Sequence, residues 1–133
     1  MGHVRGSPGV VGALPAFVLV EQLPVRLRSE DCADLQLTVG LEFTDVDETF
    51  TVEIRRGIAE TRSAPGTTRH PSAVDATVAG PRTALGPLLM GAVGVDEGLD
   101  HPELVLTGER ADLERFFGAF DDVFSAYPPF FLR

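Results

Sequence analysis

The stretch VLTGERADLERFFGA, residues 105–119, decides the predicted fold because it repeats an earlier pattern, TVAGPRTALGPLLMG at residues 77–91. In both copies, residues typical of a strand lead to a glycine, and a leucine and a pair of apolar residues follow at helical spacing. Gly80 of the first copy corresponds to Gly108 of the second. The repeat therefore predicts two strand–turn–helix units, each returning a helix to the same face of one sheet.

Upstream of the repeat, apolar and polar residues alternate with the period of a half-buried strand. Every second residue is apolar in LQLTVGLEF (residues 35–43) and in FTVEI (residues 50–54). This period predicts strands with one buried face, with Thr51 and Glu53 facing outward. An Arg-Gly turn then leads into IAETR (residues 58–62). Three strands joined by short turns predict an antiparallel meander.

The N-terminal part of the chain predicts a tail and a buried helix. Residues 1–9 show no periodicity, so we expect a flexible tail, followed by a single domain over residues 10–133. The helix is expected to begin near Ala13 and end by Pro24. Its buried stripe is predicted from helical spacing, and its members are Leu14, Phe17, Val18 and either Gln22 or Val25.

The same apolar run is too short and too interrupted for a targeting or membrane segment. Pro15 breaks it, and no small-residue cleavage site follows. It is also far below the roughly 20 apolar residues that a membrane span needs. We therefore expect a cytoplasmic protein without a membrane span.

Composition restricts the classes of partner and site. The net charge of −9 over 133 residues argues against nucleic acid, whose phosphates it would repel. Cys32 is the single cysteine, which excludes an internal disulfide and a four-thiolate zinc site. The acidic clusters at residues 45–48 and 96–103 lack the ligand spacing of an EF-hand loop, so we interpret both as solvated turns. We predict no catalytic residue, no metal site and no cofactor.

Together these elements predict an α+β fold: a five-stranded, mostly antiparallel sheet with helices packed on one face. Residues 63–72, SAPGTTRHPS, are predicted to be a loop between the meander and the repeat. In the second helix a long apolar stripe is predicted, which contains Leu113, Phe116, Phe117, Phe120 and Phe124. Such a stripe would pack against the sheet.

Three segments, in this order and spacing, resemble the C-terminal domain of bacterial alkyl sulfatases, which has the sterol carrier protein 2-like (SCP2-like) fold. They are residues 23–62, residues 74–91 and ELVLTGERADLERFFGAFDD at residues 103–122. The likeness is strongest at the FTD turn after the first strand, at the DAT strand and in the last strand–glycine–helix unit.

The resemblance implies an apolar tunnel between sheet and helices that accepts a fatty acid, an alkyl sulfate or a sterol-like ligand. In alkyl sulfatases the domain follows a zinc-dependent catalytic domain and helps to hold the alkyl tail of the substrate. This chain has only three histidines and no His-x-His-x-Asp-His stretch, so we expect it not to be an enzyme. The residues expected to line the tunnel are Phe17, Phe43, Phe50, Val52, Leu89, Phe116, Phe117, Phe120 and Phe124.

Alternatives to a free-standing lipid-binding module remain. The chain could be a detached substrate-binding domain or subunit of an alkyl sulfatase, with a separate hydrolase or a second copy as its partner. It could also be a protein-interaction domain that uses the apolar groove or the C-terminal YPPFFLR tail. The phenylalanines could equally fill a closed core. Arg82 and Arg110, the repeated pair, would serve the first helical turn or cover apolar surface with their stems. The functional alternative for this pair is contact with an anionic headgroup.

Overall fold

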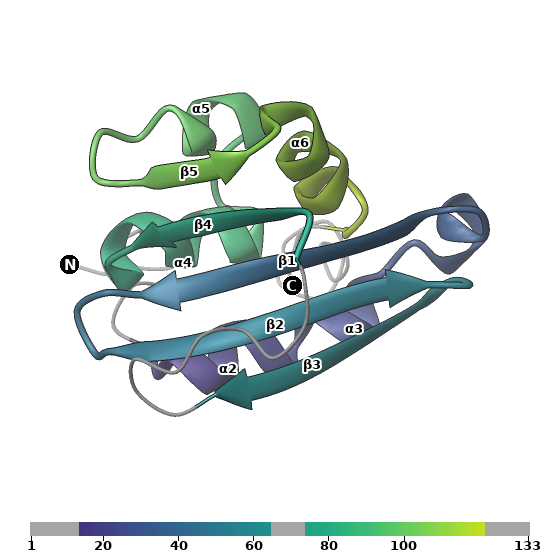
Figure 1. Ribbon diagram of the computed structural model, residues 1–133, viewed down its shortest axis with the longest axis horizontal. Helices are drawn as coiled ribbons and strands as arrows, with labels where there is room; N and C mark the ends of the chain where they lie inside the picture. The colour runs from purple at the N-terminus through teal and green to yellow at the C-terminus, as the bar shows by residue number, and fades with distance from the viewer. Residues whose placement is uncertain (1–13, 65–73, 122–133) are drawn as a thin grey trace, which may run out of the picture.

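The computed structural model describes residues 14–64 and 74–121, and the predicted tail at residues 1–9 lies outside them. No helix in the described ranges is both long and apolar enough to cross a membrane. In chain order the elements are α2 (Ala16–Glu21), α3 (Leu23–Arg26), the 3-10 turn η2 (Ser29–Cys32), β1 (Gln36–Phe43), β2 (Glu48–Arg55), β3 (Ile58–Ala64), β4 (Ala76–Gly80), α4 (Arg82–Met90), α5 (Val95–Leu99), β5 (Val105–Gly108) and α6 (Arg110–Gly118) (Figure 1).

The five strands form one mixed sheet in the order β3-β2-β1-β4-β5. The predicted meander is confirmed, because β1 pairs antiparallel with β2 and β2 with β3. The β4 strand runs parallel to β1, and β5 returns antiparallel to β4. Figure 1 shows α2, α3 and α4 behind the sheet and α5 and α6 beside β4 and β5. The predicted α+β class is therefore confirmed.

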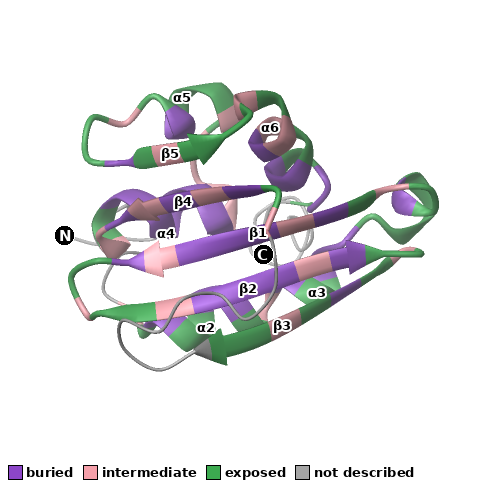
Figure 2. Cartoon of the chain, viewed as in Figure 1, coloured by how far each residue is buried: buried purple, intermediate pink, exposed green. Residues whose placement is uncertain are grey.

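The core lies between the sheet and the helices. Val39, Leu41, Val52 and Ile54 on the central strands are all fully buried, as their alternation predicted. In Figure 2 burial concentrates along β1 and β2, while much of the edge strands β3 and β5 is exposed. Thr51 was predicted to face outward, but this prediction is wrong, because the residue is only 6% exposed. It is a short side chain on a central strand, and in the sheet register it lies between Gly40 of β1 and Arg62 of β3.

The first helical segment turns a different face to the core than predicted. Phe17, Val18 and Val25 are exposed, at 52%, 36% and 81%. The buried side consists of Ala16, Leu19, Val20 and Leu23. Residues 16–20 are all apolar, so their periodicity could not select a face. The predicted end at Pro24 is also wrong, because Pro24 lies in the first turn of α3, where its missing N–H is tolerated.

Three further boundaries differ from the predictions. The α5 helix occupies residues 95–99, so the acidic stretch there is not purely a turn. The β3 strand extends to Ala64, into the predicted loop, whose residues 65–72 lie outside the described ranges. The α6 helix ends at Gly118, so Phe120 leaves the predicted helical stripe and forms an isolated antiparallel bridge with Leu27.

The two glycines of the repeat terminate their strands for different reasons. Gly108 has a φ of +91°, a backbone conformation that favours glycine. Gly80 is not in that region, but a Cβ there would lie 2.5 Å from the Leu104 side chain and 3.1 Å from a backbone oxygen. A Cβ at Gly108 would lie 2.7 Å from the Asp75 carbonyl oxygen. Each glycine thus allows the antiparallel partner strand to approach closely.

Candidate functional site

A cleft of about 490 Å³ opens beside the C-terminal end of α4. The α4–α5 connection forms one side, and the end of α6 and the segment after α3 form the other. Its volume falls in the range of roughly 300–1,000 Å³ that is typical of small-molecule sites. The residues that line it are Arg26, Arg28, Leu88, Leu89, Gly91, Ala92, Val93, Gly94, Val95, Glu97, Phe117, Gly118 and Phe120.

Two backbone features contribute to the walls of the cleft: the end of α4 and a pairing of two segments distant in sequence. Gly91, with a φ of +75°, ends α4 in the left-handed cap position and donates its N–H to carbonyls of the last turn. Across the cleft, two segments distant in sequence pair as a short antiparallel ladder. The Arg28 N–H donates to the Ala119 carbonyl at 2.9 Å, and the Asp121 N–H donates to the Arg26 carbonyl at 2.9 Å. This pairing fixes Phe120 in the wall.

Arg26 is a buried guanidinium that joins three elements behind this wall. It is 7% exposed. Its Nε donates to the Asp121 carbonyl at 2.6 Å, and a terminal nitrogen donates to the Leu89 carbonyl at 2.8 Å and to the Gln22 side chain. A buried charge requires such partners, and a cation is favoured at the carbonyl end of α4. We therefore assign Arg26 a structural role.

Arg28 lies at the rim of the cleft and is far more accessible. Its Nε is 2.8 Å from Asp121 Oδ1, and the two side chains are 48% and 53% exposed. Glu97 of α5 borders the cleft as well and is exposed. The rim therefore carries charge, and most of the surface exposed in the cleft is polar.

Three of the predicted lining residues meet in this cleft: Leu89, Phe117 and Phe120. The two phenylalanines are each 6% exposed and Leu89 is 1% exposed. Phe116, also predicted, is fully buried behind them and packs edge-to-face on both, with ring centroids 5.0 and 5.3 Å apart. Phe116 is thus a core residue that supports the wall.

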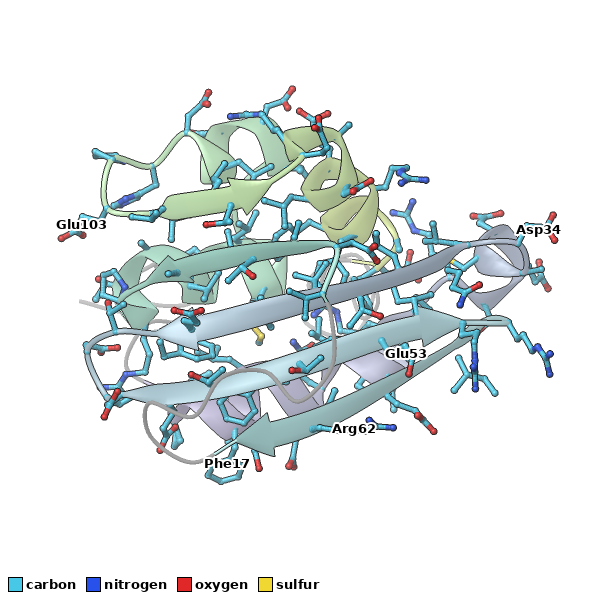
Figure 3. All side chains as sticks on the ribbon, viewed as in Figure 1. Phe17, Asp34, Glu53, Arg62 and Glu103 are labelled. Carbon is cyan, nitrogen blue, oxygen red and sulfur yellow. The ribbon has the colours of Figure 1, made fainter. Side chains whose placement is uncertain are left out.

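The remaining predicted residues do not join this group. Phe43 and Phe50 pack edge-to-face with centroids 5.7 Å apart, and Val52 is fully buried; none of the three borders the cleft. Phe17 is exposed on α2, and Figure 3 shows it at the lower edge of the molecule. Phe124 lies outside the described residues.

The repeated arginines are engaged in ion pairs. Arg82 holds Asp45 at 2.9 Å, and Arg110 holds Asp100 at 2.9 Å and Glu114 at 3.1 Å. Burial alone would raise the pKa of the Asp45 carboxyl, but hydrogen bonds and the charge of Arg82 outweigh it and hold the pKa below its ordinary value. Neither arginine borders the cleft, so the structure favours the helix-terminus role over a headgroup contact.

The lining residues predicted from the sequence did not include Arg26 and Arg28, which border the cleft. The signal was the RLR triplet after the first helix, where an arginine on each side of a leucine could face the same surface of an extended segment. Its meaning depends on Asp121, which lies 95 positions after Arg26. Spacing within the triplet carries no information about that partner.

In residues 14–64 and 74–121, no three His, Cys, Asp or Glu side chains converge to hold a metal ion. Burial raises the pKa of the Cys32 thiol, with a further contribution from Asp31, so the thiol stays protonated near neutral pH. The cleft offers apolar surface and charge but not a nucleophile with an adjacent base.

Comparison with protein families places this geometry in a known group. The family described as alkyl sulfatase C-terminal matches residues 5–128. A linear primary-alkylsulfatase from Pseudomonas sp. is 31% identical over 121 residues, which cover 86% of this chain and 21% of that protein. A second linear primary-alkylsulfatase from Pseudomonas is 24% identical, over 87% of this chain and 17% of that protein. The chain spans about a fifth of the length of these curated relatives.

Solved structures agree on the fold. A stereoselective inverting sec-alkylsulfatase from Pseudomonas sp. superposes with a TM-score of 0.69 at 21% identity, over 83% of this chain and 17% of that chain. A palmitated SCP2L2 protein from Aedes aegypti gives a TM-score of 0.53 at 12% identity, over 78% and 95% of the two chains. At these identities the likeness establishes the SCP2-like fold and nothing finer.

Proposed function

The chain belongs to the alkyl sulfatase C-terminal family, and we propose that it binds a long alkyl or acyl chain without catalysing a reaction itself. The observation that carries the proposal is the cleft beside α6, which has a volume of about 490 Å³ and has the nearly buried side chains of Leu89, Phe117 and Phe120 among its lining residues. Apolar pockets with a few polar groups at the rim are typical of such ligands. The palmitated relative of the same fold supports this choice.

Apolar burial supplies enough free energy for reversible binding. Burying a twelve-carbon chain at about 0.8 kcal/mol per methylene gives on the order of 10 kcal/mol. Association costs on the order of 4–15 kcal/mol in lost freedom. The balance favours affinities in the micromolar range or weaker, with little selectivity for chain structure, which suits a domain that takes up and releases its ligand.

A second candidate is that the domain presents the alkyl tail of a substrate to a hydrolase, as a part or subunit of an alkyl sulfatase. The specific observation is that the two curated relatives are alkylsulfatases about five and about six times as long as the matched region. The two candidates share the same cleft. Co-purification with a hydrolase from the native host would favour the second.

Binding is tested with the 133-residue chain and a fluorescent long-chain fatty acid. We expect saturable binding, displacement by dodecanoate and by dodecan-1-ol, and a rise in the melting temperature, because a ligand that binds only the folded state stabilises it. Phe17→Ala is the matched control, since this exposed phenylalanine lies away from the cleft. A lack of saturable binding together with an unchanged melting temperature would contradict the proposed function.

A further inference from the structure

The β3 strand is a long and regular edge of the sheet. It is seven residues long, contains no proline and pairs one-to-one with β2 without a bulge. The opposite edge, β5, is only four residues long and ends in Gly108, which has a positive φ. Short edge strands, prolines and bulges are the usual devices that prevent an edge from pairing with another chain. Of the two edges, β3 is therefore the one that can accept a further strand.

The turn before β3 determines which of its backbone groups face the open edge. The two turn residues, 56 and 57, have φ values of 56° and 74°, which identify a two-residue type I′ hairpin turn. Such a turn hydrogen-bonds the residues that flank it. Hydrogen-bonded and non-hydrogen-bonded positions alternate along antiparallel strands, so the N–H and C=O groups of Ala59, Thr61 and Ser63 point away from β2. No described residue outside β2 forms a backbone hydrogen bond with these three.

Two opposite charges make this edge complementary to a second copy of itself. Glu60 and Arg62 flank Thr61, and their side chains are 62% and 61% exposed. When two β3 strands pair antiparallel about Thr61, Glu60 of each copy lies opposite Arg62 of the other. These are non-hydrogen-bonded positions, where facing side chains approach most closely. Two-fold symmetry produces this attractive pair twice.

Exposed apolar side chains gather on the same side of the molecule. Figure 1 shows α2 and α3 behind β2 and β3, and Figure 3 shows Phe17 of α2 at the edge that β3 forms. A two-fold axis through Thr61 and perpendicular to the sheet would bring the α2 and α3 helices of both copies together behind the paired strands, so that this apolar surface is covered. Within the described residues the large exposed apolar side chains are those of Phe17, Val18, Val25, Ile58 and Val105, and all but Val105 belong to α2, α3 or β3.

We propose that β3 is a homodimer interface, in which two copies of this chain pair antiparallel about Thr61 and join their two sheets into one. The net charge of −9 on each copy opposes association, but salt screens this long-range repulsion more than it screens the close pairs at the interface. No residue of β3 borders the cleft beside α6. The inference is therefore independent of the proposed function.

The oligomeric state of the 133-residue chain tests the proposal. In sedimentation velocity at physiological ionic strength, the wild type should change from monomer to dimer as its concentration rises. Glu60→Arg and Arg62→Glu should each weaken dimerisation by about tenfold or more, because each places like charges opposite one another at both symmetry-related positions. An equimolar mixture of the two variants should restore the dimer, since every facing pair is then of opposite charge. The double variant Glu60→Arg/Arg62→Glu should dimerise as the wild type does.

Glu103→Arg is the matched charge control, because Glu103 is exposed just before β5, on the far side of the molecule from β3 (Figure 3). It should leave dimerisation intact. Thr61→Pro removes an N–H that faces the open edge but none that bonds to β2, so it should abolish the dimer while circular dichroism shows that the fold persists.

Three results would overturn the proposal: a wild type that stays monomeric at every concentration, a dimer that tolerates both charge reversals, or a loss that neither the mixture nor the double variant recovers. The charge variants decide the outcome even where Thr61→Pro does not fold. Titration with the fluorescent fatty acid is a separate measurement, so a monomeric protein that binds the probe would overturn the dimer and leave the proposed function intact.

Discussion

Phe116 and Phe117 are neighbours in sequence but have different roles in the structure. Phe116 is fully buried in the core, whereas Phe117 and Phe120 reach the cleft wall. Edge-to-face contacts join all three rings through Phe116. The second copy of the repeat is therefore rich in phenylalanine for two reasons, core filling and the building of a wall.

This division predicts unequal effects of truncation. Phe116→Ala should lower the free energy of unfolding by about 3–5 kcal/mol, because it leaves a cavity in a packed core. Phe117→Ala and Phe120→Ala should cost less, because one side of each ring already borders open space, and they should weaken binding of a fatty-acid probe. Urea unfolding and probe titration measure the two effects. Equal stability losses without a change in probe affinity would show a closed core instead.

The glycine that ends β5 gives a second residue-scale prediction. Gly108→Ala should destabilise the protein by at least about 1–2 kcal/mol, because its φ of +91° is unfavourable for other residues and its Cβ would meet the Asp75 carbonyl. Gly118→Ala, at the end of α6, is the matched control. A Cβ there meets nothing within 4 Å, and alanine favours the helix, so thermal melts should show a small stabilisation. Similar melting temperatures for both variants would contradict this account.

At the scale of elements, the two faces of β2 should respond oppositely to charge. Val52→Asp should unfold the protein or destabilise it severely, because it places an unpaired charge in the core. Glu53 lies opposite Glu60 of β3 in the sheet register, and like charges in that arrangement repel. Glu53→Lys should therefore raise stability by about 0.2–1 kcal/mol. Figure 3 shows Glu53 on β2, next to the β3 strand that carries Arg62. Urea melts that show equal losses for both variants would contradict the one-sided sheet.

The contact between the β1–β2 turn and α4 predicts a dependence of stability on pH. Asp45 accepts hydrogen bonds from the backbone and side chain of Arg82 at the start of α4, and its pKa is lowered from 3.8 in the folded state. A carboxyl whose pKa is lower in the folded state than in the unfolded state stabilises the fold at pH values above its unfolded-state pKa. This stabilisation is lost as the pH falls through its folded-state pKa. Asp45→Asn should therefore be less stable than wild type at pH 7, and the difference should shrink below about pH 3.8. A difference that is constant with pH would contradict this role.

For the whole molecule, we predict no hydrolysis of alkyl sulfates by this chain alone. Activation of water at neutral pH needs a bound metal or an equivalent base, and the described residues gather no three metal-ligating side chains. Incubation with zinc and decyl sulfate should release no more sulfate than buffer does. Zinc-dependent turnover would contradict the prediction, provided that a chelator abolishes it.

The sequence alone predicted the sheet and the repeat because both are encoded locally. Alternation in residues 35–43 and 50–54 is sufficient to predict strands with one buried face, and Val39, Leu41 and Val52 are buried as expected. The glycines of the repeat ended their strands as predicted. Each of these features depends on neighbours within a few positions, so a local pattern carries it.

Only the tertiary structure decided the face of the first helix and the place of the cleft. Residues 16–20 are all apolar, so packing against the sheet, and not periodicity, selected Leu19 over Phe17 for the core. Phe120 left the helical stripe because its segment pairs with the one that carries Arg26. Arg26 and Asp121 are 95 positions apart, and contacts at such separation form only when the whole fold closes.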